Sequence, residues 1–227
     1  MKIPTLAQQR ILIVDDHPIF RKGIAMLLEH EPDILICGEA ETAAQALGLV
    51  EHQNFDLVIA DISLKDINGI ELVKSLRAIK PHLPVLVLSM HDESLYAERA
   101  LRAGARGYLM KQAPPDQVVS AIRQVLRGDL YLSAAANLLL LNTFVAGKGH
   151  DESGKSSVEK LSDRELEIFE LLGMGRGTST IAHDLRLSVK TIEAHRSHIK
   201  TKLGIHTAPE LVRAAVEWVT QHSGAGE

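Results

Sequence analysis

The fold of the first half of this 227-residue chain is decided by a short stretch, ILIVDDHP at residues 11–18. Its four leading apolar residues are typical of a strand that is buried on both faces of a sheet. Two carboxylates follow at once, and Pro18 then suits the first position of a helix, where no backbone donor is needed. The stretch therefore predicts a buried strand, a polar loop and a helix that begins at Pro18.

The same pattern recurs along the first 130 residues or so. Apolar runs predict strands at Ile11–Val14, Ile34–Cys37, Leu57–Ala60, Val85–Leu88 and Gly107–Met110. The stretches between them have helical periodicity, from Pro18 and at 42–53, 69–80, 93–103 and 115–127. Regular alternation of strands and helices implies right-handed crossovers. We therefore expect a flavodoxin-like, doubly wound α/β domain with five parallel strands and five helices.

The rest of the chain has a different pattern. An apolar helix is predicted at Ser133–Val145, and residues 147–157 then contain three glycines and three serines without periodicity, which is typical of a flexible linker. From Val158 onward the pattern is helical only. We predict an α/β domain at 10–130, a linker helix and flexible linker at 131–157, and an all-α domain of four helices at 158–222.

Composition narrows the possible classes of protein. The net charge is -4, so the chain as a whole does not coat nucleic acid, although a local basic patch still could bind it. Cys37 is the single cysteine, which excludes an intrachain disulfide and a cysteine metal cluster and suits a reducing compartment. The first residues lack the apolar core of a signal peptide, and no run of about 18 apolar residues follows. We expect a cytoplasmic protein without a membrane span.

Polar side chains follow four of the five predicted strands. They are Asp15 and Asp16, then Asp61, Ser89 and Lys111. In an open parallel sheet the ligand crevice lies beyond the carboxyl ends of the strands, so these side chains should converge. A single acid after a strand is usually a helix cap or a solvated loop residue. The whole set at the ends of four strands is much harder to obtain by chance.

This set of side chains suits phosphoryl transfer to a carboxylate. Carboxylates packed together repel one another and need a hard divalent cation such as Mg²⁺, which takes oxygen ligands. An aspartate can attack phosphorus and form an acyl phosphate. The cation and a lysine then offset the charge on the transferring group, and a serine hydroxyl donates to its oxygens.

Sequence motifs surround these positions. They are IVDDHP at 13–18, Asp61 with Asn68 and Gly69 downstream, VLS at 87–89 and GARGYLMK at 104–111. By these motifs residues 10–127 resemble the receiver domain of bacterial two-component response regulators. The resemblance implies that Asp61 accepts a phosphoryl group from a sensor histidine kinase and that Mg²⁺ is the cofactor.

The resemblance also implies a role for each neighbour of Asp61. Asp16 and the backbone carbonyl of Ser63 would bind Mg²⁺ together with Asp61, with Asp15 acting mainly through bound water. Ser89 would sense the phosphoryl group and Lys111 would pair with it.

Three further positions lie close to these motifs. Tyr108 matches the switch aromatic of the family, which swings inward when the serine moves; without the resemblance it is a half-buried strand residue. Gln112 stands where many receivers have proline, so the cis peptide expected at a Lys-Pro bond is in doubt. His17 is interpreted as a solvated residue at a helix start and not as a phosphate carrier.

The last part of the chain predicts a helix-turn-helix. Ser162 and Glu165 form a capping box before an apolar stripe, and helices are predicted at 178–185 and Val189–Leu203, joined by a short turn with Ser188 as N-cap. Between Arg186 and His206 five basic residues accompany one acid, a local net charge of +4. A basic helix after a short capped turn is typical of a DNA-binding motif.

Residues 158–222 resemble the LuxR-type output domain of NarL/FixJ-class response regulators, through LSDRE at 161–165, SVKTIEAHR at 188–196 and IKTKLG at 199–204. The resemblance implies that the helix from Val189 enters the major groove of double-stranded DNA. Val189, Lys190 and Glu193 would face base edges. The DNA backbone would be contacted by Thr191, His195, Arg196 and Lys200.

Some features of this domain allow two interpretations. Glu193 either reads a base or points to solvent and holds Arg196 at helical spacing. GTST at 177–180 replaces a family sequence that contains a lysine, so the phosphate contact there should be weaker. The last helix, near 208–222, either forms the homodimer contact of the family on activation or packs against the basic helix.

The leading interpretation is a phosphorylation-gated transcriptional regulator, not an enzyme beyond catalysing its own phosphorylation and dephosphorylation. One alternative is a constitutive DNA binder whose receiver serves for dimerisation. The other is a phosphatase-type enzyme on the same scaffold. That class needs a second aspartate two residues after the nucleophile, where this chain has Ser63.

Overall fold

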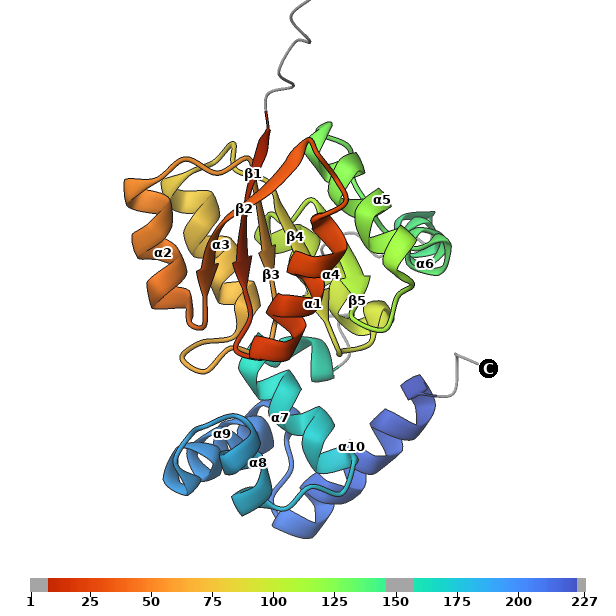
Figure 1. The fold of residues 1–227 in the computed structure, drawn as a ribbon. Helices are drawn as coiled ribbons and strands as arrows, with labels where there is room; N and C mark the ends of the chain where they lie inside the picture. Colours follow the sequence, from red (N-terminus) through yellow and green to blue (C-terminus); the bar gives the residue numbers. More distant parts are fainter. Residues whose placement is uncertain (1–7, 146–156, 224–227) are drawn as a thin grey trace, which may run out of the picture. The chain divides into compact units, whose positions relative to one another are not determined.

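A five-stranded parallel sheet forms the centre of the first of the two units into which the chain divides, residues 1–147 and 148–227 (Figure 1). The computed structural model describes residues 8–145 and 157–223. The strands are β1 (Gln9–Val14), β2 (Ile34–Ala40), β3 (Leu57–Ala60), β4 (Val85–Ser89) and β5 (Gly107–Met110). Their order is β2-β1-β3-β4-β5, which is the flavodoxin-like order, so the predicted fold class is confirmed.

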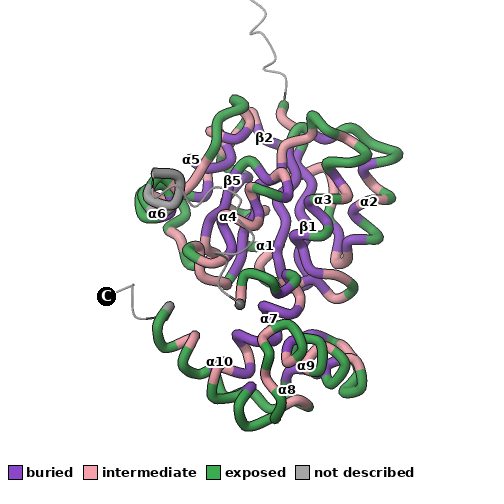
Figure 2. Tube along the Cα trace, turned by 180° about the vertical axis from the view of Figure 1, so that it is seen from behind, coloured by how far each residue is buried: buried purple, intermediate pink, exposed green. Residues whose placement is uncertain are grey.

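Helices cover both faces of this sheet. They are α1 (Pro18–Leu28), α2 (Ala43–His52), α3 (Gly69–Ile79), α4 (Glu93–Ala103) and α5 (Pro115–Leu126). Helices α1 and α5 share one core with alternate residues of the strands, while α2, α3 and α4 cover the other face (Figure 1). Because both faces are covered, the central strands β3 and β4 are buried along their length, and the outer faces of the helices are exposed (Figure 2).

Two predicted strand ends were wrong. Strand β2 continues to Ala40, three residues beyond the apolar run, because it is an edge strand in which exposed residues such as Glu39 interrupt the apolar pattern. Ser89 is the last residue of β4 and not the first residue after it, since its backbone still pairs with Met110 of β5. Helix ends differ by about one residue, because flanking residues such as Thr42 act as caps.

Helix α6 (Ala134–Val145) follows the α/β layers and agrees with the predicted linker helix to within one residue. Most of the predicted flexible linker, 147–156, lies outside the described residues. Ser157 begins the short 3-10 helix η2 (Ser157–Lys160). The finer domain boundaries at 130 and 158 stay predictions.

After η2, the described residues of the second unit form four α-helices joined by short loops. They are α7 (Asp163–Gly173), α8 (Thr178–Asp184), α9 (Val189–Leu203) and α10 (Ala208–Ser223). Ser162 and Glu165 form the predicted capping box, Ser188 caps α9, and Gly204 ends α9 in the left-handed conformation. The buried side chains include Leu166, Phe169, Ile181, Ile192, Ile199 and Leu211.

Helix α10 packs against α7 and not mainly against the basic helix α9, so that alternative prediction was wrong. Phe169 of α7 and Trp218 of α10 lie with ring centroids 5.8 Å apart. Gly173 allows the approach, because a Cβ there would lie 2.4 Å from the backbone oxygen of Ala215. None of the described helices combines the length and apolar character that crossing a membrane requires.

Two glycines in helices of the first unit should respond in opposite directions to alanine. A Cβ at Gly69 would lie 1.9 Å from the backbone oxygen of Asp61, whereas a Cβ at Gly48 in α2 would meet no atom within 4 Å. We expect Gly69→Ala to lower the free energy of unfolding by at least about 1–3 kcal/mol because backbone must move. Gly48→Ala should raise it by about 0.5–1 kcal/mol through helix propensity.

Urea unfolding of the full chain followed by far-UV circular dichroism measures both changes. Trp218 is the only tryptophan, so its fluorescence reports the second unit separately and should be unchanged in both variants. Equal stabilities of the two variants would contradict the close approach at Gly69.

Candidate functional site

The register of the sheet places the predicted polar residues at one edge. Val14, Ala60, Val87 and Tyr108 lie in one row across β1, β3, β4 and β5. Asp15 and Asp61 each follow this row directly, and the amide of Asp61 donates to Val14 O at 2.9 Å. Ser89 and Lys111 lie a little further along, joined by a 2.8 Å backbone hydrogen bond from Lys111 N to Ser89 O. The structure therefore brings the strand ends together as the sequence predicts.

Lys111 forms ion pairs with two of the carboxylates at this edge. Its Nζ lies 2.6 Å from Asp15 Oδ2 and 2.7 Å from Asp61 Oδ2, and only 5% of its side chain is exposed. The same Nζ lies 4.5 Å from the centroid of the Phe20 ring, a favourable cation–π distance. No pattern in the sequence predicts this contact.

Asp61 is a buried carboxylate with one oxygen still available. Lys111 donates to Oδ2, whereas Oδ1 is buried and accepts no hydrogen bond from the described residues. Burial raises the pKa of Asp61 to about 6; the Lys111 charge opposes the shift and the Asp15 charge adds to it. An acceptor without a partner in such a place is costly unless a ligand satisfies it.

The carboxylates at this edge also fit a divalent cation. Asp15, Asp16, His17 and Asp61 each present one ligand atom, and all four atoms lie within 4.8 Å of one another. Ionised, the three carboxylates beside one lysine leave two negative charges, which Mg²⁺ would balance with the oxygen ligands that it prefers. The residues present therefore fit the predicted cation.

His17 and Arg21 support the loop after β1. His17 is largely exposed, as predicted, but its Nδ1 lies 2.8 Å from Asp16 Oδ1 and 3.2 Å from Asp15 Oδ1. Arg21 donates to the backbone oxygen of Asp15 at 2.6 Å and to Glu39 at 2.9 Å. Arg21 stands one helical turn after Pro18, on the buried face, and this position could have suggested its role.

His91 connects the predicted switch residues and was missed by sequence analysis. Its backbone amide donates to Ser89 Oγ at 3.3 Å, and its carbonyl accepts from the hydroxyl of Tyr108 at 2.8 Å. Its Nε2 lies 2.9 Å from Ser63 Oγ, and its ring lies 4.6 Å from that of Tyr96. The available signal was its position, two residues after Ser89 in the loop beyond β4.

Tyr108 is fully buried in β5. The alternative prediction of a half-buried strand residue was therefore wrong about its burial. Within the described residues every peptide bond is trans, including the one between Lys111 and Gln112.

In the second unit, α9 presents a polar face that begins at its capped end. Val189 is 49% exposed, and Lys190 and Glu193 are exposed as well. Four of the predicted DNA-binding residues, Thr191, His195, Arg196 and Lys200, are half-buried. The core side of the helix is fixed by Ile192 and Ile199, which are fully buried. The N-terminal turn of α9 is therefore the part most open to a ligand.

Two contacts fix side chains on α9. Arg196 donates to Glu193 Oε1 at 2.9 Å, which is the interpretation in which Glu193 holds Arg196. Arg196 also donates to Thr178 Oγ1, so a residue of the divergent GTST sequence positions a basic side chain. Thr191 takes part in the cap of α9, because its amide donates to Ser188 Oγ at 3.0 Å.

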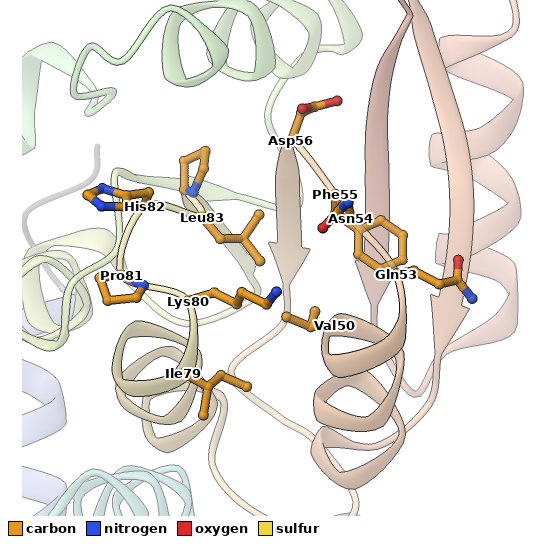
Figure 3. A pocket seen from close by; sticks show the side chains of 11 residues that line it. Val50, Gln53, Asn54, Phe55, Asp56, Ile79, Lys80, Pro81, His82 and Leu83 are labelled. Atoms are coloured by element: carbon orange, nitrogen blue, oxygen red, sulfur yellow. The ribbon is translucent and has the colours of Figure 1, made fainter.

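A further hollow of about 350 Å³ lies at the opposite end of the sheet, before the first residues of β3 and β4 (Figure 3). The titratable side chains in its lining are Asp56, Lys80 and His82, and they do not converge on one point (Figure 3). This hollow therefore lacks the arrangement seen around Asp61.

The raised pKa of Asp61 predicts how the stability of the first unit depends on pH without divalent cations. The folded-state pKa lies above the ordinary aspartate value, so the folded state binds the Asp61 proton more tightly than the unfolded state. The stabilisation of the fold by this proton is complete below about pH 4 and is lost as pH rises through 6. Between pH 5 and pH 8 the wild type should lose about 1–2 kcal/mol of unfolding free energy relative to Asp61→Asn.

Urea unfolding in EDTA at both pH values measures this difference. Asp129→Asn, at a largely exposed position, is the control and should show the same pH dependence as the wild type. A constant gap between Asp61→Asn and the wild type at pH 5 and pH 8 would contradict the prediction.

Known proteins resemble both halves of the chain. Residues 11–123 match the family model of the response regulator receiver domain, and residues 159–215 match that of the bacterial regulatory proteins of the luxR family. The oxygen regulatory protein NreC of Staphylococcus aureus is 37% identical over 210 residues, covering 92% of this chain and 97% of that protein. NreC of Staphylococcus carnosus has the same identity and coverage.

Solved structures show the same relationship. A LuxR-family two-component response regulator from Aurantimonas sp. SI85-9A1 is 33% identical, with a TM-score of 0.57, and covers 61% of this chain and 99% of its own. RcsB from Salmonella enterica serovar Typhimurium, solved bound to a promoter in the presence of the phosphomimetic BeF3-, is 26% identical, with a TM-score of 0.60, and covers 92% and 98%. The chain therefore belongs to the NarL/FixJ class of two-component response regulators, transcription regulators in which a receiver domain precedes a LuxR-type DNA-binding domain.

Proposed function

We propose that Asp61 accepts a phosphoryl group from a sensor histidine kinase, and that this modification changes DNA binding and dimerisation of the second unit. One observation carries the proposal: Asp61 Oδ1 is buried and accepts no hydrogen bond from the part of the chain that the structure describes, while Oδ2 accepts from Lys111. The geometry leaves Oδ1 as the nucleophile. It forms the new bond to phosphorus as the bond between phosphorus and the kinase imidazole nitrogen breaks, and that nitrogen keeps the electron pair.

The cofactor of this step is Mg²⁺. Asp16, Asp61 and the backbone carbonyl of Ser63 would hold it, with Asp15 acting through water. When bound, Mg²⁺ supplies charge that offsets the oxygens of the transferring group. Lys111 does the same from the protein side and orients Asp61 through its 2.7 Å contact.

Ser89 and Tyr108 are proposed to relay the modification. Ser89 Oγ would turn to a phosphoryl oxygen and leave the amide of His91, which it now accepts at 3.3 Å. Tyr108, which is buried and donates to the carbonyl of the same His91, would be the switch aromatic in its inward position. Phosphorylation would then favour this inward arrangement, because both contacts meet at one residue.

The second unit is proposed to bind double-stranded DNA by placing the first turns of α9 in the major groove. Val189 and Lys190, which are exposed at that end, would face base edges, and Glu193 would do so on releasing Arg196. Thr191, His195, Arg196 and Lys200 would contact the DNA backbone. Solved structures of the relative RcsB include two dimers bound to two parallel DNAs. In this chain the exposed Val212 and Val216 of α10 would form the homodimer contact, and the protein would act in the cytoplasm.

Asp61→Asn should abolish acyl-phosphate formation, because an amide is not a nucleophile toward phosphorus. The full chain is incubated with acetyl phosphate and Mg²⁺ and its intact mass is measured. Wild type and the control Asp129→Asn should both gain the mass of one phosphoryl group, and EDTA should prevent the gain. A phosphoryl adduct on Asp61→Asn would show that Asp61 is not the phosphorylation site.

Lys190→Ala should reduce discrimination between an operator selected from random DNA and unrelated DNA. The expected loss is about 1–3 kcal/mol, because a base contact contributes to one sequence and not the other. Fluorescence anisotropy at fixed salt measures both affinities. Lys160→Ala removes the same charge from an exposed position in η2 and should preserve the ratio of the two affinities. Equal weakening on both DNAs would show instead that Lys190 contacts phosphate.

A further inference from the structure

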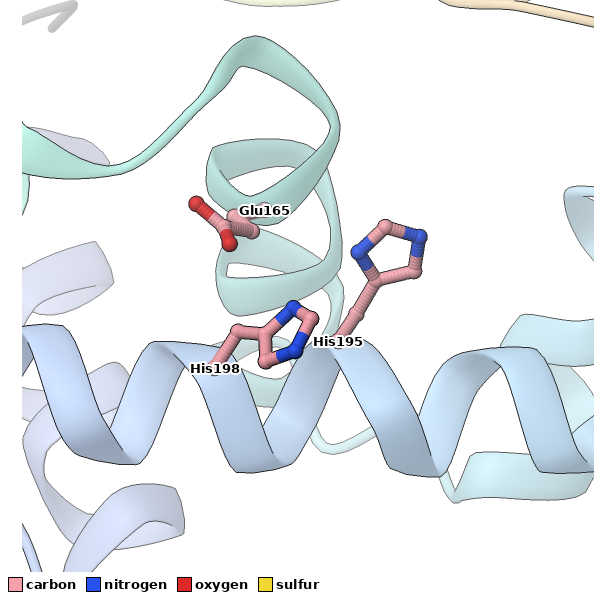
Figure 4. Close-up of side chains that lie close together, drawn as sticks. All are labelled: Glu165, His195 and His198. Atoms are coloured by element: carbon pink, nitrogen blue, oxygen red, sulfur yellow. The ribbon is translucent and has the colours of Figure 1, made fainter.

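A second group of metal-binding side chains lies within the second unit. Glu165 of α7 and His195 and His198 of α9 each present one ligand atom, and these atoms all lie within 4.8 Å of one another (Figure 4). The two histidines are three residues apart on one helix, so both project from the same face toward α7. The carboxylate approaches them from the facing helix (Figure 4).

We propose that Glu165, His195 and His198 bind a zinc ion that fastens α9 to α7. Two imidazoles and one carboxylate form a known zinc ligand set, in which water takes the fourth position. Imidazole nitrogens favour zinc over Mg²⁺ and Ca²⁺, which take mainly oxygen ligands. The site is independent of the chemistry proposed for Asp61.

The ligands are in suitable forms for a metal. Metal binding requires a neutral imidazole and an ionised carboxylate. Burial lowers the pKa of His195, which favours its neutral ring. Burial alone would raise the pKa of Glu165, but hydrogen bonds from Lys202 and Ser162 outweigh it and lower this pKa.

Lys202 competes with a metal for the same carboxylate. Its Nζ lies 2.6 Å from Glu165 Oε2, and 39% of its side chain is exposed. A bound zinc ion would repel this ammonium, which can turn into solvent on its long side chain. Lys202 therefore limits the affinity of the site for zinc. A variant that lacks the Lys202 ammonium group should bind zinc more tightly.

The position of the site gives zinc a direct influence on the DNA-binding helix. His195 lies in the middle of α9, and it is one of the residues proposed to contact the DNA backbone. Arg196, the next residue, contacts Thr178 of α8. Helix α9 therefore already contacts α8. A zinc ion at His195 and His198 would in addition connect α9 to α7.

Zinc titration of the full chain tests the proposal. ZnCl₂ is added in saturating MgCl₂, which occupies the carboxylates around Asp61, and binding is followed by calorimetry and by the imidazole NMR signals. His198→Asn should weaken binding at this site at least about tenfold. His198 is exposed, so this variant should keep the fold. His183→Asn is the control, because its largely exposed side chain lies outside the cluster, and it should bind like the wild type.

A second variant tests the competition directly. Lys202→Met should bind zinc more tightly than the wild type, and the signals of His195 and His198 should shift together in both proteins. Equal zinc affinities in the wild type and His198→Asn would overturn the proposal. So would a Lys202→Met variant that binds no more tightly than the wild type, because Glu165 would then not be a ligand.

Discussion

The receiver unit depends on one electrostatic constraint, the burial of Asp15 and Asp61 on the same ammonium group. Carboxylates brought out of water beside each other would repel strongly, and Lys111 compensates them at 2.6 and 2.7 Å. Removing one partner of a buried pair typically costs about 3–5 kcal/mol, so these three residues stabilise the sheet edge only as a set. One lysine cannot neutralise the carboxylates of this edge, however, and this leaves a deficit of positive charge. Burial raises the pKa of Asp61 to about 6, against the charge of Lys111, and the Asp15 charge adds to the shift. The same deficit makes the edge suitable for a cation and a phosphoryl group.

The sequence predicted this edge because its geometry follows from backbone rules. Parallel strands end at one side of a sheet, so residues placed after the strands must meet there, as Asp61 and Lys111 do. Strand β2 was predicted too short because an edge strand is partly exposed and carries residues such as Glu39 that break an apolar pattern. The contacts of His91 could not be predicted, since side-chain and backbone hydrogen bonds of a loop leave no periodic signal. The same holds for α10: the helix was predicted, but its packing partner α7 was not.

In the second unit, capping motifs and helical periodicity again predicted the helices better than the contacts between them. The capping box at Ser162 and Glu165 was evident from residue types and spacing, and the structure contains both of its hydrogen bonds. Glu165 has a second role that spacing did not suggest, since it also accepts from Lys202 of α9 at 2.6 Å. Buried Ile192 and Ile199 fix the core side of the same helix. The exposed end at Val189 is therefore presented by a helix that is held by packing and by an ion pair.

His91 gives a physical basis for the proposed relay within the receiver. Its amide, its carbonyl and its ring each take part in a hydrogen bond, with Ser89, Tyr108 and Ser63 respectively. A change at Ser89 therefore cannot be confined to the serine, because the residue it contacts also positions the buried tyrosine. Packed interiors respond to such changes by moving between discrete arrangements and not by gradual deformation. A hydroxyl that exchanges a backbone amide for a phosphoryl oxygen is a small local change, but here it would act on a segment whose other contacts reach both β5 and the loop after Asp61.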